Sequence, residues 1–154
     1  MHIESLISES RTLIIAGERT REGVLRRIAR AASAALDGRS EDFLLGELVN
    51  RERRYPTCTP EGVAFPHAML KGIERNVLVV ASVRPGVDFG VSGYAPVTLA
   101  FGLIGDESRP FEHVKILARL ARIARAPRAI GRLTACTDAH ALYEQVIAED
   151  RSHE

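Results

Sequence analysis

The apolar positions at the start of the chain form first a continuous run and then a helical pattern. Residues 13–16, Leu-Ile-Ile-Ala, form a run that Gly17 ends, which predicts a short strand. Thr20 then precedes a segment whose apolar residues recur every three or four positions, so we expect a capped helix that ends at Gly38. The predicted buried side of this helix consists of Val24, Leu25, Ile28, Ala31, Ala32 and Ala35.

A second helix is predicted to begin after Ser40. Glu41 and Asp42 follow, and acidic residues are favoured in a first turn because the helix dipole is positive there. Its predicted inward-facing residues are Phe43, Leu44 and Leu48, with Leu45 as a further candidate. The next segment, residues 51–62, holds two prolines and a glycine and is predicted to be a loop.

The middle of the chain shows three extended segments. Residues 63–65 are apolar and short, and Pro66 favours extended backbone at the residue before it. Residues 76–83 are rich in valine and predict a buried strand that Pro85-Gly86 breaks. Residues 97–104 predict one more strand, which Gly105-Asp106 closes.

The last third is predicted to be helical. Residues 111–125 form a long helix, and Pro127 ends it before a short helix with Ala129, Ile130 and Leu133 inward. Asp138 is the expected cap of a final helix, and residues 150–154 are expected to fray. The apolar residues of that helix are Leu142, Tyr143, Val146 and Ile147. Helices on both sides of central strands predict one mixed α/β or α+β domain over residues 1–154.

Composition narrows the function classes. The chain has 154 residues with a net charge of +1, so no overall field favours nucleic acid or a membrane surface. No apolar stretch reaches the ~18 residues that a membrane span needs, and no signal-peptide pattern opens the chain. Cys58 and Cys136 make no disulfide framework. We therefore expect a cytoplasmic protein.

Several kinds of chemistry lose support. The sequence has no phosphate-binding P-loop, no paired-glycine dinucleotide loop, no HExxH metal motif and no nucleophile elbow at Ser92. These absences argue against ATP-dependent, dehydrogenase and serine-hydrolase activities, and we expect no cofactor. Zinc is not expected either, because the possible ligands match none of the usual ligand spacings. Those possible ligands are Cys58, His67, His113 and Cys136.

Two histidines are candidate site residues. His67 follows Pro66 at the end of an extended run, where a loop is expected to begin, and the rigid proline limits how its backbone can aim the ring. The alternative is a partly buried histidine satisfied by backbone hydrogen bonds. His113 lies in the first turn of a predicted helix, where anions are favoured. The alternative there is an ordinary surface residue, as we expect for His140.

The predicted helix that begins near His113 carries only basic charges. Residues 113–137 contain no aspartate or glutamate, and Lys115, Arg119 and Arg122 are spaced to share one helical face. This face could dock an acidic partner, or it could simply be solvated. Nucleic acid is not expected as a partner, because no aromatic residues interleave with the basic ones.

Three segments together resemble the type-2 enzyme IIA family of the bacterial phosphotransferase system, the fructose, mannitol and nitrogen-regulatory branch. The first is Arg-Glu-Arg-Arg-Tyr-Pro-Thr at residues 51–57, followed by Gly-Val-Ala-Phe-Pro-His at residues 62–67. The second is Pro-Gly-Val-Asp-Phe at residues 85–89, and the third begins at His113 and runs to Ala121. The similarity covers about residues 5–148.

The resemblance implies roles for four residues. His67 matches the phosphorylated histidine, and His113 matches the second active-site histidine. Arg51 matches the arginine that steadies the phosphate, and Thr57 matches the motif threonine. The chain departs from the family pattern beside these positions. It has Tyr55-Pro56 where the family usually has Gly-Ser, and Ala68-Met69 where Gly-Lys is common.

The family also implies a fold and a chemistry. The expected fold is a mixed central sheet with helices on both faces. The expected activity is that of a phosphohistidine phosphotransferase component. A neutral imidazole, with an ordinary pKa of ~6.5, is available as a nucleophile at pH 7. Since no P-loop is present, the donor should be a histidine phosphocarrier protein rather than ATP, and the acceptor should be the outer ring nitrogen.

The resemblance leaves the physiological role open among three alternatives. A nitrogen or metabolic regulator is the leading one. A sugar-specific enzyme IIA that passes phosphate to an enzyme IIB is the second. A non-catalytic binding module with the same fold is the third, and the departures at residues 55–56 and 68–69 favour it.

Overall fold

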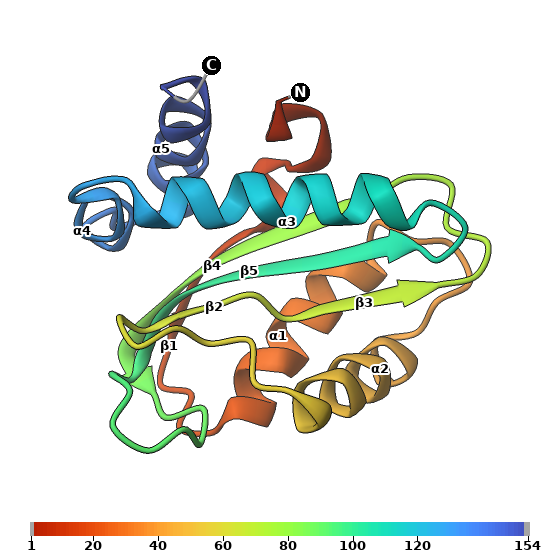
Figure 1. Ribbon diagram of the computed structural model, residues 1–154, viewed down its shortest axis with the longest axis horizontal. Coiled ribbons are helices and arrows are strands. Elements are labelled where there is room, and N and C mark those ends of the chain that lie inside the picture. The colour runs from red at the N-terminus through yellow and green to blue at the C-terminus, as the bar shows by residue number, and fades with distance from the viewer. Residues whose placement is uncertain (1, 153–154) are drawn as a thin grey trace.

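A mixed five-stranded sheet forms the centre of residues 2–152, the part of the chain that this computed structural model describes (Figure 1). The strands are β1 (Thr12–Ala16), β2 (Val63–Ala64), β3 (His67–Leu70), β4 (Val77–Val87) and β5 (Val97–Asp106). β4 and β5 form an antiparallel pair, with β1 parallel to the outer side of β4. Both β2 and β3 run parallel to β5 and lie one after the other along its free edge.

Helices cover both faces of this sheet (Figure 1). They are α1 (Arg21–Ser33), α2 (Glu41–Arg54), α3 (Pro110–Arg125), α4 (Ala129–Thr134) and α5 (Ala139–Arg151), preceded by two short 3₁₀ turns, Ile3–Leu6 and Glu9–Arg11. α1 and α2 pack on one face, and α3, α4 and α5 pack on the other. The predicted mixed sheet with helices on both faces is confirmed.

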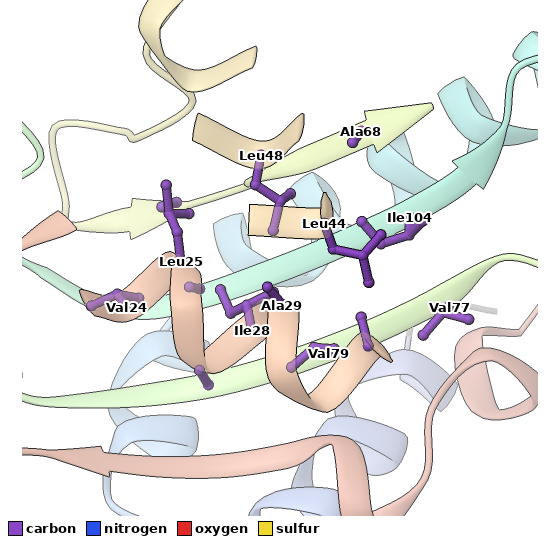
Figure 2. Packing of buried hydrophobic residues seen from close by; sticks show 14 of the residues in the cluster. Val24, Leu25, Ile28, Ala29, Leu44, Leu48, Ala68, Val77, Val79 and Ile104 are labelled. Carbon is purple, nitrogen blue, oxygen red and sulfur yellow. The ribbon is translucent and has the colours of Figure 1, made fainter. Parts of the chain in front are cut away.

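The two cores follow from the alternation of side chains along β4. Val77 and Val79 point into the core under α1 and α2, whereas Leu78 and Val80 point into the core under α3 and α5. In Figure 2, apolar side chains of α1 and α2, such as Ile28 and Leu44, gather against the sheet. A strand buried on both sides explains the continuous valine-rich run in the sequence.

The predicted helix starts are confirmed by their caps. The side chain of Thr20 accepts a hydrogen bond from the Gly23 amide at 3.0 Å, and that of Ser40 accepts one from Phe43 at 3.1 Å. Asp138 accepts one from the Ala141 amide at 2.8 Å. Each cap satisfies an amide that has no partner inside the helix.

Three predictions of local structure were wrong. α2 continues through residues 51–54 and ends at its cap residue Tyr55, where Pro56 favours extended backbone. Phe43 is 43% exposed and lies near the Arg39 guanidinium instead of in the core. β4 continues through Pro85 to Val87. The pairing of β1 with β4 ends at Arg84, and the register of β4 against β5 shifts between Ser82 and Val87, so Pro85 lies outside the regular ladders. A proline is tolerated where no ladder partner needs its amide.

The expected fraying of residues 150–154 was also wrong at Asp150, while residues 153–154 lie outside the described part. Asp150 is buried, and its carboxylate accepts hydrogen bonds from Arg119 Nε and from the Ile3 amide, the latter at 3.0 Å. The Arg119 side chain is also buried, so it does not belong to an exposed basic face. This ion pair joins α3, α5 and the N-terminal turn. No helix within residues 2–152 has the length and apolar character of a membrane span.

We predict that Asp150→Ala lowers the free energy of unfolding by about 3–5 kcal/mol, because it leaves the Arg119 guanidinium buried without its counter-charge. Urea unfolding followed by circular dichroism measures this. The control is Arg151→Ala, which removes an exposed ion pair with Glu4 and should cost less than about 1 kcal/mol. Equal losses in the two variants would contradict the structural role of Asp150.

Candidate active site

His67 is the first residue of β3, at the free edge of the sheet. Its predicted position before a loop was wrong, because the chain continues as a strand for four residues and pairs with β5. The Pro66 carbonyl accepts a hydrogen bond from the Leu103 amide at 2.9 Å, which joins the short gap between β2 and β3 to β5. The backbone on both sides of His67 is therefore held to the sheet.

A backbone hydrogen bond sets the orientation of the His67 ring. Nδ1 lies 2.8 Å from the Phe65 carbonyl oxygen. A carbonyl can only accept, so Nδ1 carries the proton and the Nε2 lone pair is left available. Burial lowers the pKa of His67 below its ordinary value, and the charge of Arg51 lowers it further, while the Phe65 carbonyl and Glu52 oppose the shift. The ring is thus kept neutral near pH 7.

Phe65, whose carbonyl orients His67, is held through its amide by Thr57, and Thr57 is held by Glu52. Thr57 donates to the buried Glu52 carboxylate through both its amide and its hydroxyl, each at 2.7 Å. The Thr57 hydroxyl oxygen accepts the Phe65 amide at 3.2 Å. A continuous set of hydrogen bonds therefore links the end of α2 to Phe65 and then to His67. In this structure Thr57 is a positioning residue.

No role was predicted for Glu52 from the sequence. The features that could have indicated one are that it follows Arg51 in the motif and stands five residues before the motif threonine. An isolated glutamate near a helix end is ordinarily exposed, so its burial could not be predicted.

Gly62, which begins the second half of the motif, has a φ of 91° and lies against the Pro96 carbonyl, where a Cβ would collide. Glycine is therefore required for the approach of this loop to β5.

His113 lies beside His67, although 46 positions separate them in the sequence (113 − 67). The two ring centroids are 5.3 Å apart, with the planes at 53°. His113 is only 3% exposed, so the alternative of a surface residue was wrong. Both of its ring nitrogens lack a hydrogen-bond partner within residues 2–152.

The packing around His113 leaves room for little except the ring. A Cβ at Gly105 of β5 would lie 2.6 Å from His113 Nδ1, so a larger residue there would displace the ring. Burial, then the neighbouring His67, then Arg51 lower the pKa of His113 to about 4. A neutral, buried imidazole with no protein partner can donate one hydrogen bond to a bound group.

Arg51 lies in the last turn of α2. Its Nη1 donates to the Tyr55 carbonyl at 3.0 Å, which caps the end of the helix. Its positive charge contributes to lowering the pKa of both His67 and His113, so the guanidinium lies close enough to act on the two rings. Its Nη2 has no hydrogen-bond partner within residues 2–152 and can serve a bound anion.

The departures from the family pattern have distinct environments. Tyr55 is exposed at the end of α2, beside the site. Ala68 is buried in the core under α2, whereas Met69 is half-buried and shares the face of β3 that carries His67. The lysine common in the family at this position would therefore lie on the same face as His67. In the described residues no group of three or more metal-ligand side chains is arranged to hold a metal ion.

The chain is similar to known proteins over nearly its whole length. Residues 6–149 match the family described as phosphoenolpyruvate-dependent sugar phosphotransferase system, EIIA 2. The chain is 32% identical over 143 residues to the nitrogen regulatory protein of Bradyrhizobium diazoefficiens, which covers 93% of each protein.

Two solved structures share the fold. The nitrogen regulatory protein IIA-Ntr from Neisseria meningitidis aligns with a TM-score of 0.84 at 21% identity, covering 94% of this chain and 98% of that one. The mannitol enzyme IIA of Escherichia coli, solved in complex with phosphorylated enzyme IIB, gives 0.74 at 19% identity, covering 92% and 97%.

We predict that His113 makes stability fall as the pH drops from about 6.5 to about 4. Above about pH 6.5 the His113 ring is neutral in both the folded and the unfolded protein. Between the two pKa values the ring binds a proton in the unfolded protein but not in the folded one, so the fall in pH favours unfolding. The full loss is about 3 kcal/mol. Urea unfolding across this pH range should show a shallower slope for His113→Gln than for the unsubstituted protein. Identical slopes would contradict the lowered pKa.

Proposed function

The chain belongs to the phosphoenolpyruvate-dependent sugar phosphotransferase system EIIA 2 family, as its motifs indicated, and we propose that it carries a phosphoryl group on His67 Nε2. The observation that carries this proposal is the hydrogen bond from Nδ1 to the Phe65 carbonyl, which directs the proton to one nitrogen and the lone pair to the other. In this proposal the phosphoryl transfer takes place in the cytoplasm, with a histidine phosphocarrier protein as the donor.

The proposed step is an in-line transfer between two imidazoles. The Nε2 lone pair of His67 forms the new N–P bond while the N–P bond of the donor phosphohistidine breaks, and the electron pair of that bond returns to the donor ring. Positive charge develops on the His67 ring, where the Phe65 carbonyl and the nearby Glu52 carboxylate stabilise it. The reverse sequence releases the phosphoryl group to an acceptor.

Arg51 and His113 serve the phosphoryl oxygens in this proposal. Phosphoryl transfer depends mainly on positioning and on stabilising charge. The guanidinium of Arg51 supplies charge-assisted hydrogen bonds, and the neutral ring of His113 supplies one more donor. Support for the second role comes from the two unpartnered ring nitrogens of His113.

We propose further that this carrier is a nitrogen or metabolic regulator. The relative that is 32% identical is named a nitrogen regulatory protein, which supports this reading. A regulator needs only a surface that changes with its phosphorylation state, and a phosphoryl group adds about −1.5 to −2 charges at neutral pH. The alternative is transfer to an enzyme IIB, which the complex of the E. coli mannitol enzyme IIA with phosphorylated enzyme IIB supports.

We predict that His67→Ala abolishes acid-labile, base-stable labelling from radiolabelled phosphoenolpyruvate in the presence of the phosphocarrier system. The physical reason is the loss of the nucleophilic nitrogen. The control is His140→Ala, which removes an exposed imidazole on α5 that contacts Glu9 and should leave labelling intact. Undiminished labelling of the His67 variant would remove it as the acceptor.

We predict that His113→Ala is still phosphorylated but at a rate reduced about 10²-fold, the typical cost of losing one charge-stabilising donor. Rapid-quench measurement of single-turnover transfer from the phosphocarrier protein gives this rate. An unchanged rate would make His113 a structural residue only.

We predict that a regulatory target binds the unphosphorylated protein and the charge-mimicking variant His67→Glu with different affinities, because the added charge lies beside Arg51. Pull-downs from the native organism with both forms, followed by mass spectrometry, measure the difference. If the only partner recovered is a sugar-permease enzyme IIB that accepts the phosphoryl group rapidly, the regulatory role is wrong.

A further inference from the structure

A cavity of about 580 Å³ lies between the α3–α4 junction and the chain around β2. These elements lie at the same end of the molecule in Figure 1. Its lining is mainly apolar and includes Val63, Phe65, Ala124 and Ile130. The volume is in the range of pockets that hold small organic ligands. The proposed phosphoryl transfer makes no use of this cavity.

Two arginines give the cavity a preferred charge. Arg125 and Arg128 both line it, and Glu61 is the acidic residue there, so the lining carries a net charge of +1 (2 − 1). Arg125 uses Nε to bond the Ala121 carbonyl at 3.3 Å, and its terminal nitrogens have no hydrogen-bond partner within residues 2–152. The Arg128 side chain makes no ion pair or hydrogen bond in the described residues, whereas its backbone carbonyl accepts a hydrogen bond from the Arg132 amide at 3.0 Å. A monoanion fits this balance better than a dianion.

The backbone of Arg128 is strained. Its φ is 64°, in the left-handed region that side-chain-bearing residues avoid, and it is the one non-glycine residue of residues 2–152 with a positive φ. A strained residue of this kind persists where surrounding structure enforces it, often at a ligand site. Here the strain occurs at an arginine on the wall of the cavity.

We infer that this cavity binds a small monocarboxylate with an apolar body. The apolar part packs against Phe65, Ala124 and Ile130, and the carboxylate accepts hydrogen bonds from Arg125 and Arg128. Planar guanidinium groups suit a carboxylate because both offer paired, parallel contacts.

Phe65 connects this cavity to the candidate active site. Its ring lines the cavity and stacks on Phe101 at 5.7 Å, while its amide bonds to Thr57 and its carbonyl accepts from His67 Nδ1. A ligand that contacts the ring therefore acts on the residue that orients His67. This coupling between the cavity and His67 rests on the proposed function only for its effect on phosphoryl transfer. Its effect on the His67 ring can be measured without phosphate.

The binding is tested with 4-phenylbutyrate as the probe and 4-phenylbutan-1-ol as its uncharged match. Titration of the ¹⁵N-labelled protein should shift the amide resonances of Ala124, Ile130 and Phe65 saturably. The acid should bind at least about tenfold more tightly than the alcohol, because a hydrogen bond to a charged group typically changes the affinity by about this factor. Equal affinities, or no saturable shift at these amides, would overturn the inference.

Variants identify the charges responsible. In the double variant Arg125→Gln with Arg128→Asn, the preference for the acid should disappear; asparagine tolerates the left-handed backbone at position 128. The matched control is Arg122→Gln, an exposed arginine of α3 outside the cavity, which should keep the preference. An unchanged preference in the double variant would overturn the roles of the two arginines.

The coupling is tested by the NMR titration of the His67 ring in the unphosphorylated protein. Saturating probe should change the pKa of His67 and leave that of His140 unchanged. An unaltered His67 titration would overturn the coupling. Separate measurement of labelling at His67 distinguishes the two proposals, since a protein that binds the probe but accepts no phosphate refutes only the carrier function.

Discussion

The buried carboxylate of Glu52 is the constraint on which the candidate site depends. A buried charge is costly unless hydrogen bonds satisfy it. Both oxygens of Glu52 find their partners in one residue, Thr57. The loop after α2 must therefore fold back so that Thr57 meets the helix end. That path places the Thr57 hydroxyl under the Phe65 amide, and the Phe65 carbonyl then meets the His67 ring. The position of the His67 ring is thus set by a carboxylate that acts on it through Thr57 and Phe65.

His113 shows the opposite arrangement, in which the polar groups of a buried side chain are left unsatisfied. His113 is buried with no hydrogen-bond partner in the described residues for either ring nitrogen, which costs stability in the free protein. Its lowered pKa means that it does not regain stability by protonation near neutral pH. A bound phosphoryl oxygen would provide the missing partner. The hydrogen bond formed by His113 would then contribute to the binding free energy of the phosphoryl group, because the ring donor has no partner in the described residues of the free protein.

Local patterns predicted most of the fold, whereas the burial of Asp150 depends on a pairing between distant residues. The caps at Thr20, Ser40 and Asp138 are short-range interactions, so the sequence sufficed to place those helix starts. The pairing of Arg119 with Asp150 joins residues 31 positions apart, and no periodicity on α3 distinguishes this arginine from exposed ones.

The candidate site divides in the same way. The adjacency of His67 and His113 was expected only from the family resemblance, and the role of Glu52 required knowledge of its burial. A glutamate in a helix end gives the same sequence signal whether it is solvated or enclosed.

The surface around the candidate site is suited to more than one partner. Three of the large exposed hydrophobic side chains, Tyr55 (72%), Phe111 (83%) and Val114 (62%), are close in sequence to Arg51 or His113. Apolar groups exposed near charged ones are typical of protein contacts that form and dissociate. In the proposed function, a donor and a target that both cover His67 would use this surface in turn. Phosphorylation of His67 would then change the charge at the centre of the shared surface, so the choice between partners would need no rearrangement of the fold.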